Sequence, residues 1–206
     1  MNEKDIQALT ELLATPKKIA IIPHRSPDGD AMGSTLALYH FLLKLNHNPV
    51  VISPNEFPNS LAWLPGSETV LIYENDKENG TKILNEAELV FTLDFNALHR
   101  TGEMEQVLNK LSAPMIMIDH HQKPDIYATV TYSDTSIGST CEMIYNLISY
   151  LDKKDLLDKT IATCIYTGIT TDTGSFRFPS TTSTTHRITA DLIDLGINNS
   201  AVHNLL

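Results

Sequence analysis

Short apolar runs alternate with stretches of helical periodicity along most of the chain. Five runs have the length and composition of buried strands: Lys18–Pro23, Val50–Ser53, Thr69–Tyr73, Glu88–Leu93 and Pro114–Ile118. Apolar side chains recur at helical intervals in five other segments: Asp30–Leu45, Glu103–Leu111, Gly138–Leu151, Lys159–Thr171 and Thr184–Leu195. This alternation predicts an α/β fold, a doubly wound parallel sheet of about five strands with helices on both faces.

The chain shows no internal repeat and no low-complexity segment. Two stretches, Pro54–Pro65 and Asn75–Thr81, have the composition of linkers, but neither is long enough to divide the chain. We therefore expect one domain over residues 1–196. Residues 197–206 are expected to begin another helix or a linker.

Charge and cysteine content narrow the class of protein. The formal net charge of −10 argues against a basic nucleic-acid coat, although bound metal ions can reverse the charge locally. Two cysteines do not make a disulfide framework. With no apolar signal segment and no stretch of roughly 20 apolar residues, we expect a cytoplasmic protein without a membrane partner.

Polar residues that can bind metals follow four of the expected elements. They occur in His24-Arg25-Ser26-Pro27-Asp28-Gly29-Asp30, at Asp94, in Asp119-His120-His121 and at Asp172. The carboxyl ends of parallel strands share one edge of a sheet, where ligands bind. Each piece also has an ordinary structural interpretation, such as a polar loop or a helix cap, and Asp30 alone would make a good N-cap.

Taken together, these residues indicate a metal site far more specifically than any one of them does alone. Carboxylates packed so closely would repel one another unless cations lay between them. A site for two divalent ions explains the cluster, because such ions activate a water and clamp phosphoryl oxygens. Oxygen and imidazole ligands favour manganese, with magnesium as the other choice. Neither a nucleophile-elbow motif nor a Cys-x-x-Cys pair is present.

A fifth segment, Gly174-Ser175-Phe176-Arg177-Phe178, leaves two interpretations open. Its phenylalanines are as well suited to core packing as to a ligand site. Arg177, between them, is suited to a phosphate or a base.

With these motifs in order, the sequence resembles the DHH phosphoesterase superfamily over about Lys17 to Gly196. The pattern is His24-x-x-x-Asp28-x-Asp30, then Asp94, then Asp119-His120-His121, then Asp172. Two further segments, Leu93-Asp94-x-x-x-x-x-Arg100-x-Gly102 and the one from Gly174 to Phe178, are similar to the branch containing bacterial nano-RNases. Members of that branch act as oligoribonucleases and as phosphatases of 3′-phosphoadenosine 5′-phosphate (pAp).

The resemblance implies roles for individual residues. One manganese ion would be held by His24, Asp28 and Asp94. The other would be held by Asp30, Asp94, His120 and Asp172, with Asp94 bridging the two. His121 would assist the leaving group or the phosphate, Asp119 would support the histidines, and Arg100 would lie near the scissile phosphate. Substrate contacts are expected from Ser139 and Thr140, at a helix N-terminus, and from Arg177.

One departure from the family pattern concerns domain content. Members of this branch carry a second, C-terminal domain with a glycine-rich, histidine-containing motif, and nothing like it occurs here. Residues 1–196 would then be the DHH catalytic domain, and 197–206 the start of a linker or helix toward an absent substrate-binding domain. The expected partner is a short oligonucleotide or a nucleotide; no protein partner is predicted, and a homodimer is left open.

The leading hypothesis is a manganese-dependent phosphodiesterase or phosphatase. The alternatives are an inorganic pyrophosphatase, a cyclic dinucleotide phosphodiesterase and a nucleotide-binding module without turnover. Pyrophosphate offers no base to stack on an aromatic side chain, so the Phe176-Arg177-Phe178 segment disfavours the first of these.

Overall fold

Six parallel strands form one sheet in the computed structural model, which describes residues 1–206. They are β1 Lys18–Pro23, β2 Asn48–Ser53, β3 Leu71–Ile72, β4 Leu89–Leu93, β5 Met115–Asp119 and β6 Val130–Ser133. The strand order is β3-β2-β1-β4-β5-β6, and every neighbouring pair is parallel. The chain therefore winds outward from β1 in one direction and from β4 in the other, which confirms the predicted doubly wound fold.

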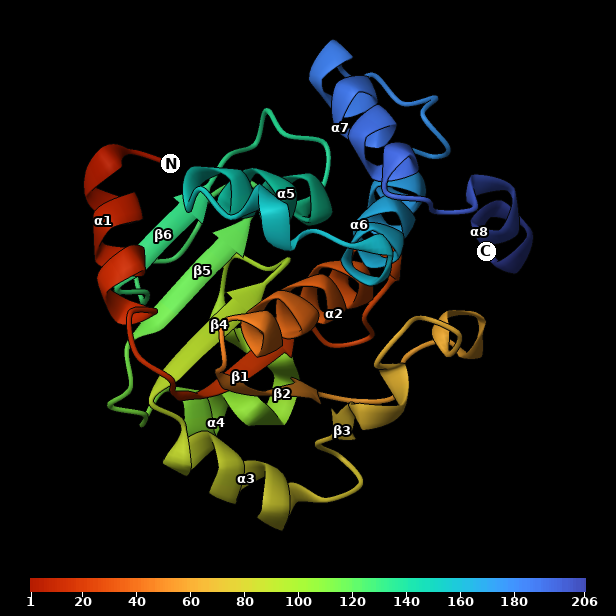
Figure 1. The fold of residues 1–206 in the computed structure, drawn as a ribbon. Coiled ribbons are helices and arrows are strands. Elements are labelled where there is room, and N and C mark those ends of the chain that lie inside the picture. The colour runs from red at the N-terminus through yellow and green to blue at the C-terminus, as the bar shows by residue number, and fades with distance from the viewer.

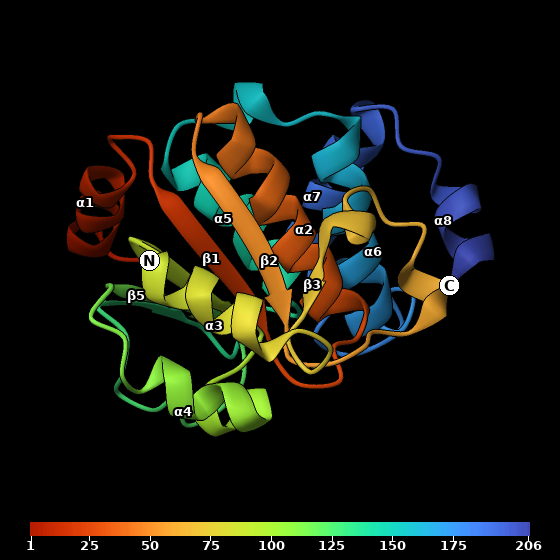
Figure 2. The ribbon, with the colours of Figure 1, turned by 90° about the horizontal axis from the view of Figure 1, so that it is seen from below.

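Helices cover both faces of this sheet (Figures 1 and 2). The eight helices are α1 Glu3–Leu12, α2 Gly29–Lys44, α3 Lys77–Glu86, α4 Glu105–Leu108, α5 Thr140–Tyr150, α6 Lys159–Asp172, α7 Ser183–Asp194 and α8 Asn199–Leu205. On one face α2 and α5 pack against the strands, α1 lies beside β6, and α6 packs outside on α2 and α5. On the other face lie α3 and α4. None of these helices has the length and apolar character needed to cross a bilayer.

The strands divide their side chains between two cores. Ile19 and Ile21 of β1 face the larger core under α2 and α5, whereas Ala20 and Ile22 face the smaller one under α3 and α4. This alternation follows from the two-residue period of a strand. Because β1 is buried on both faces, it has the continuous apolar run from which it was predicted.

Three elements differ from the expectations. The sheet has a sixth strand, β6, whose four residues alternate between buried and exposed positions and so form no apolar run. The stretch Asn75–Thr81 is not a linker, because α3 begins within it after the cap Asp76. The expected helix Glu103–Leu111 is a 3₁₀ segment, Leu98–Met104, followed by the short α4.

Glycines let α2 and α6 approach closely. A Cβ on Gly33 of α2 would lie 2.6 Å from the carbonyl oxygen of Cys164 on α6. A Cβ on Gly168 of α6 would lie 2.6 Å from Oδ1 of Asp30 at the start of α2. Real Cβ atoms do not come so close, so only glycine fits at these positions. The close packing brings the end of α6, with Asp172, next to the start of α2.

Candidate metal centre

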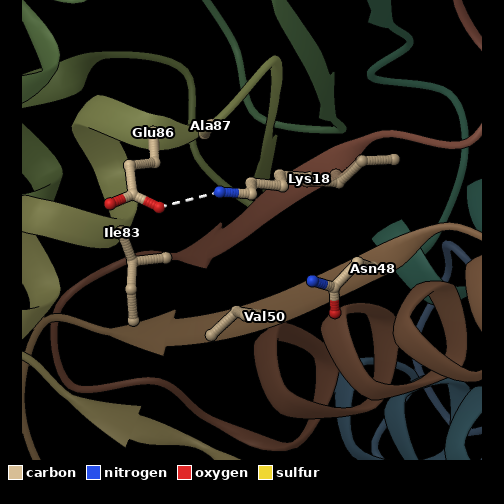
Figure 3. A pocket seen from close by; sticks show the side chains of 7 residues that line it. Lys18, Asn48, Val50, Ile83, Glu86 and Ala87 are labelled. Carbon is tan, nitrogen blue, oxygen red and sulfur yellow. Dashed lines mark hydrogen bonds and ion pairs between the residues drawn. The ribbon is translucent and has the colours of Figure 1, made fainter.

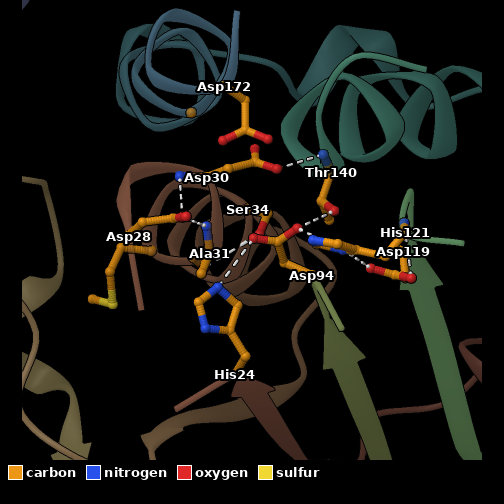
Figure 4. Close-up of polar contacts among 12 residues, drawn as sticks. His24, Asp28, Asp30, Ala31, Ser34, Asp94, Asp119, His121, Thr140 and Asp172 are labelled. Carbon is orange, nitrogen blue, oxygen red and sulfur yellow. Dashed lines mark hydrogen bonds and ion pairs between the residues drawn. The ribbon is translucent and has the colours of Figure 1, made fainter. Parts of the chain in front are cut away.

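The predicted ligands converge at the carboxyl edge of the sheet, where the strand order reverses (Figure 4). His24 directly follows β1 and Asp94 directly follows β4, and these two strands flank the reversal. Asp119 ends β5, while Asp28 and Asp30 stand at the start of α2 and Asp172 ends α6. Ligands of open α/β sheets bind at such a switch point. The fold thus brings together residues that are up to 148 positions apart, from His24 to Asp172.

Asp94 lies at the centre of the cluster and is only 2% exposed. Its backbone is left-handed, with φ of +64°, a conformation that aspartate tolerates better than most residues. Its N–H donates to the carbonyl of Ile118 on β5 at 3.0 Å, which fixes the turn. One carboxylate oxygen, Oδ1, accepts a hydrogen bond from the Thr140 hydroxyl at 2.9 Å. Asp94 therefore presents its carboxylate in a single orientation.

Two histidines direct the same ring nitrogen at Asp94. His24 donates from Nδ1 to the carbonyl oxygen of Arg25 at 2.8 Å, and His120 donates from Nδ1 to that of Ile137 at 3.3 Å. A carbonyl oxygen only accepts, so each Nδ1 carries a proton and each neutral ring has a bare Nε2. These Nε2 atoms lie 3.5 Å from Oδ2 and Oδ1 of Asp94, respectively. Lone pairs that face each other across this distance suit a bound cation.

Asp28 and Asp30 divide two tasks that the sequence left open. Asp28, not Asp30, is the N-cap of α2, and its Oδ1 accepts from the N–H groups of Asp30 and Ala31, both at 3.0 Å. Asp30 is fully buried and accepts from the N–H groups of Thr140 and Cys141, at 2.6 and 2.8 Å. The positive end of α5 thus stabilises a buried carboxylate. The alternative interpretation of Asp30 as the helix cap therefore does not hold, because Asp28 makes the cap.

Three overlapping groups have the proximity that a metal site needs. They are His24, Asp28 and Asp94; Asp30, His120 and Asp172; and Asp94, His120 and His121. Within each group, one ligand atom per residue lies within 4.8 Å of the others. Asp94 and His120 each belong to two groups, so the clusters share members. The donor set of carboxylate oxygens and imidazole nitrogens fits manganese or magnesium better than a soft metal.

The pKa values of the site residues also reflect how closely their charges are packed. Burial, with the charges of Asp94 and Asp172, raises the pKa of Asp30 well above its usual range. Burial opposes protonation of His120, but contacts with Asp172 at 3.3 Å and with Asp94 outweigh it and raise its pKa to about 11. Despite its burial, Asp94 keeps a pKa well below the usual range because both histidines contact it. Protons here supply positive charge that a metal ion would supply instead.

The second histidine of the pair has a different environment. His121 donates from Nδ1 to Oδ1 of the buried Asp119 at 2.7 Å, and its backbone N–H donates to Oδ2 at 3.0 Å. Its Nδ1 therefore carries a proton, and its Nε2 is free for another partner. This supporting contact is the one that the sequence predicted for Asp119.

Comparison with known proteins places this chain in a protein family. Residues 18–169 match the model of the DHH family, N-terminal domain. The chain belongs to the DHH family. It is 33% identical to the bifunctional oligoribonuclease and PAP phosphatase NrnA of Thermus thermophilus, over 90% of this chain and 52% of that protein. It is 32% identical to NrnA of Bacillus subtilis, over 96% of this chain and 60% of that protein.

One solved structure superposes closely on this chain. The crystal structure of an exopolyphosphatase-related protein from Bacteroides fragilis matches with a TM-score of 0.97 and 38% identity, over 99% of this chain and 60% of that one. The present chain thus spans little more than half the length of the two NrnA relatives and of this structure.

The remaining residues predicted for the DHH site differ in burial and in their hydrogen bonds. Arg100 is partly buried, its carbonyl accepts from the Arg25 N–H at 2.8 Å, and its guanidinium makes no hydrogen bond within the chain. Arg177 is exposed and donates from Nε to the carbonyl of Gly174 at 2.6 Å. Ser139 is the buried N-cap of α5, and the N–H of Thr140 is taken by Asp30. Substrate contact by Ser139 and Thr140 stays a prediction that this packing does not favour.

Sequence reasoning missed two contributors to the DHH site. One is the backbone N–H of Cys141, which binds Asp30, and the other is Gly168, which makes room for the same carboxylate. Only the presence of a single glycine within the predicted helix could have pointed to the second. A separate hollow of about 180 Å³ lies at the opposite edge of the sheet, between Lys18, Asn48 and Glu86 (Figure 3). It contains none of the predicted ligands.

Proposed function

We propose that this chain is a metal-dependent phosphoesterase that hydrolyses short oligoribonucleotides, pAp or both. The observation that carries the proposal is the convergence of two imidazole Nε2 atoms and four carboxylates on the switch point of the sheet. The names of the NrnA relatives support the choice of substrate. Because the chain spans only part of those proteins, it is proposed to supply the catalytic site rather than the whole of substrate binding.

The ligand arrangement supports two ions that share Asp94. One would be held by His24, Asp28 and Asp94, and the other by Asp30, Asp94, His120 and Asp172. Manganese is proposed first, since it accepts both carboxylate and imidazole ligands. When bound, such ions neutralise charge on a phosphoryl group and lower the pKa of a water molecule.

Residues of the chain would handle the substrate and the proton. His121 is oriented by Asp119 through Nδ1, and its imidazolium form, which is protonated on both ring nitrogens, would give the Nε2 proton to the leaving oxygen. The unpaired guanidinium of Arg100 is suited to a phosphoryl oxygen, which it can bind through two parallel N–H groups. The Thr140 hydroxyl would hold Asp94 in place between the ions.

A panel of substrates tests this proposal. Product release with Mn²⁺ is measured for a ribodinucleotide, pAp, a cyclic dinucleotide and pyrophosphate. We expect release from the dinucleotide, pAp or both. Turnover of pyrophosphate alone, or of the cyclic dinucleotide alone, would replace the proposal with one of the other hydrolase activities. Tight pAp binding without product would favour a binding module.

The variant Asp94→Asn gives the sharpest control. Asparagine tolerates the left-handed backbone of this position, so the fold should be kept while the bridging charge is lost. Asp152 has the same backbone conformation, with φ of +53°, but is exposed at the far end of α5. We expect Asp94→Asn to abolish hydrolysis and Asp152→Asn to leave it unchanged. Turnover by folded Asp94→Asn protein would contradict the proposal.

A further inference from the structure

The turn that follows Asp172 has an unusual backbone. Gly174, Ser175 and Phe176 are consecutive and all left-handed, with φ of +56°, +59° and +65°. Two of them carry side chains, for which this conformation costs free energy. Such strain persists where the surrounding structure imposes it, and it is concentrated at functional sites.

Hydrogen bonds to the end of α6 impose this conformation. The Ser175 N–H donates to the carbonyl of Thr170 at 2.8 Å, and the Phe176 N–H donates to the Thr173 hydroxyl at 3.0 Å. The N–H groups of Arg177 and Phe178 both donate to the Thr173 carbonyl, at 2.9 and 3.0 Å. The turn is therefore rigid, and its side chains are held in fixed directions.

The two phenylalanines of the turn have opposite environments. Phe176 is half-buried and packs against the larger core, with its ring centroid 6.0 Å from that of the buried Tyr166 and 5.7 Å from that of the exposed His186, on which it stacks. Phe178 is 52% exposed. Its ring lies against Gly174, since a Cβ there would be 2.6 Å from Cζ of Phe178. Core packing thus explains Phe176 but not Phe178.

The segment from Gly174 to Ser180 lies close to the candidate metal ligands at both of its ends. Gly174 is two residues from Asp172, so their Cα atoms are at most about 7.6 Å apart. Further along, the Ser180 carbonyl lies against Gly138, where a Cβ would be 3.0 Å away. Gly138 is two residues before Thr140 at the start of α5, which donates from its N–H to Asp30 and from its hydroxyl to Asp94. The segment thus borders the site from α6 to α5.

We propose that Phe178 is a base-stacking residue of this site, with the exposed ring carrying the nucleobase adjacent to the phosphate at the metal ligands. The inference rests on the proposed function, because it assumes a nucleotide substrate. A nucleotide holds its base one sugar away from its phosphate, and every base has a flat face that stacks on an aromatic ring. Arg177, fixed through Nε on Gly174, keeps its other N–H groups for a phosphate. The site would then bind short oligonucleotides with little preference for sequence.

A binding measurement tests this independently of turnover. The probe is a dinucleotide with 2-aminopurine bases and a methylene group in place of the bridging ester oxygen, titrated with protein and Mn²⁺. Stacking quenches 2-aminopurine fluorescence. We expect Phe178→Leu to weaken binding about tenfold, equivalent to about 1.4 kcal/mol, and to reduce the quenching. Phe178→Trp should keep both the affinity for the dinucleotide and the quenching of its fluorescence.

Two controls separate stacking from a structural role. Tyr150, 42% exposed at the other end of α5, is a matched aromatic, and Tyr150→Leu should bind like the wild type. Ribose 5-phosphate, which lacks a base, should bind equally to the wild type and to Phe178→Leu. Equal dinucleotide affinity in Phe178→Leu, equal losses for both ligands, or no quenching by the wild type would each overturn the inference. Hydrolysis is measured separately, in the substrate panel. Failure of the proposed function can therefore be distinguished from failure of the stacking inference.

Discussion

Single hydrogen bonds decide what each residue of the site can do. The carbonyls of Arg25 and Ile137 hold a proton on Nδ1 of His24 and His120, so that in the neutral form of each ring Nε2 is the ligand atom that faces Asp94. The sequence could indicate these residues as candidate ligands, because carboxylates and imidazoles at the ends of predicted elements are typical of a metal site. It could not separate the roles of Asp28 and Asp30, since both are equally suited to a cap or to a cation.

Thr140 provides a test at this scale. Thr140→Val keeps the shape of the side chain but removes the hydrogen bond to Asp94. We expect the free energy of unfolding to fall by about 1 kcal/mol and the affinity for Mn²⁺ to fall about tenfold. Urea denaturation and calorimetric Mn²⁺ titration measure the two effects.

The control is Thr189→Val, which removes a buried hydroxyl bonded to the Thr185 carbonyl within α7. This variant should lose stability without losing affinity for Mn²⁺. Equal Mn²⁺ affinity in Thr140→Val and the wild type would show that the hydroxyl does not orient the ligand.

At the scale of elements, packing rather than periodicity positions the site. The strands β1, β4 and β5 were predictable because burial on both faces gives them continuous apolar runs. The strand β6 was not, because its alternating pattern covers only four residues. The helix α3 was missed because Gly80 and its polar neighbours suggest a turn. Gly80 is present there because its position packs against the ring of Tyr73.

The contact between α2 and α6 is expected to be sensitive to one methyl group. A Cβ in Gly168→Ala would collide with Cys141 Sγ and with Oδ1 of Asp30. We expect a loss of about 1–3 kcal/mol in unfolding free energy, together with weakened Mn²⁺ binding. Urea denaturation and Mn²⁺ titration check both expectations.

Gly196→Ala serves as the reference, because no atom lies within 4 Å of a Cβ there and only the φ of +87° opposes the change. It should cost stability without affecting Mn²⁺ binding. If Gly168→Ala binds Mn²⁺ as tightly as Gly196→Ala does, close packing of α6 is not required for the site.

At the scale of the whole molecule, an acidic chain brings five aspartates to one edge of the sheet. The net charge of −10 would disfavour a polyanionic substrate unless cations were bound at that edge. Composition alone could not reveal this, because it does not say where the charges lie. The order of the strands determines where these charges lie, because it brings four segments to one switch point.

Metal binding should therefore release protons. His120, with a pKa of about 11, and Asp30, with a raised pKa, hold protons in the protein alone and must lose them to bind an ion. Groups that are deprotonated on binding make affinity rise with pH. We expect Mn²⁺ affinity to increase about tenfold per pH unit for each proton released, between pH 6 and 8.

Calorimetry in buffers of different ionisation enthalpy counts these protons directly. The expected result is net release at pH 7 by the wild type and less release by His120→Gln. Binding without release, or tighter binding at lower pH, would be incompatible with this account.

The central claim is that two ions occupy one site and share Asp94. Anomalous diffraction from crystals grown with Mn²⁺ tests it most directly. We predict two peaks roughly 3.5–4 Å apart, one bounded by His24, Asp28 and Asp94 and the other by Asp30, Asp94, His120 and Asp172. No peak at this edge of the sheet, or peaks not bridged by Asp94, would contradict the account.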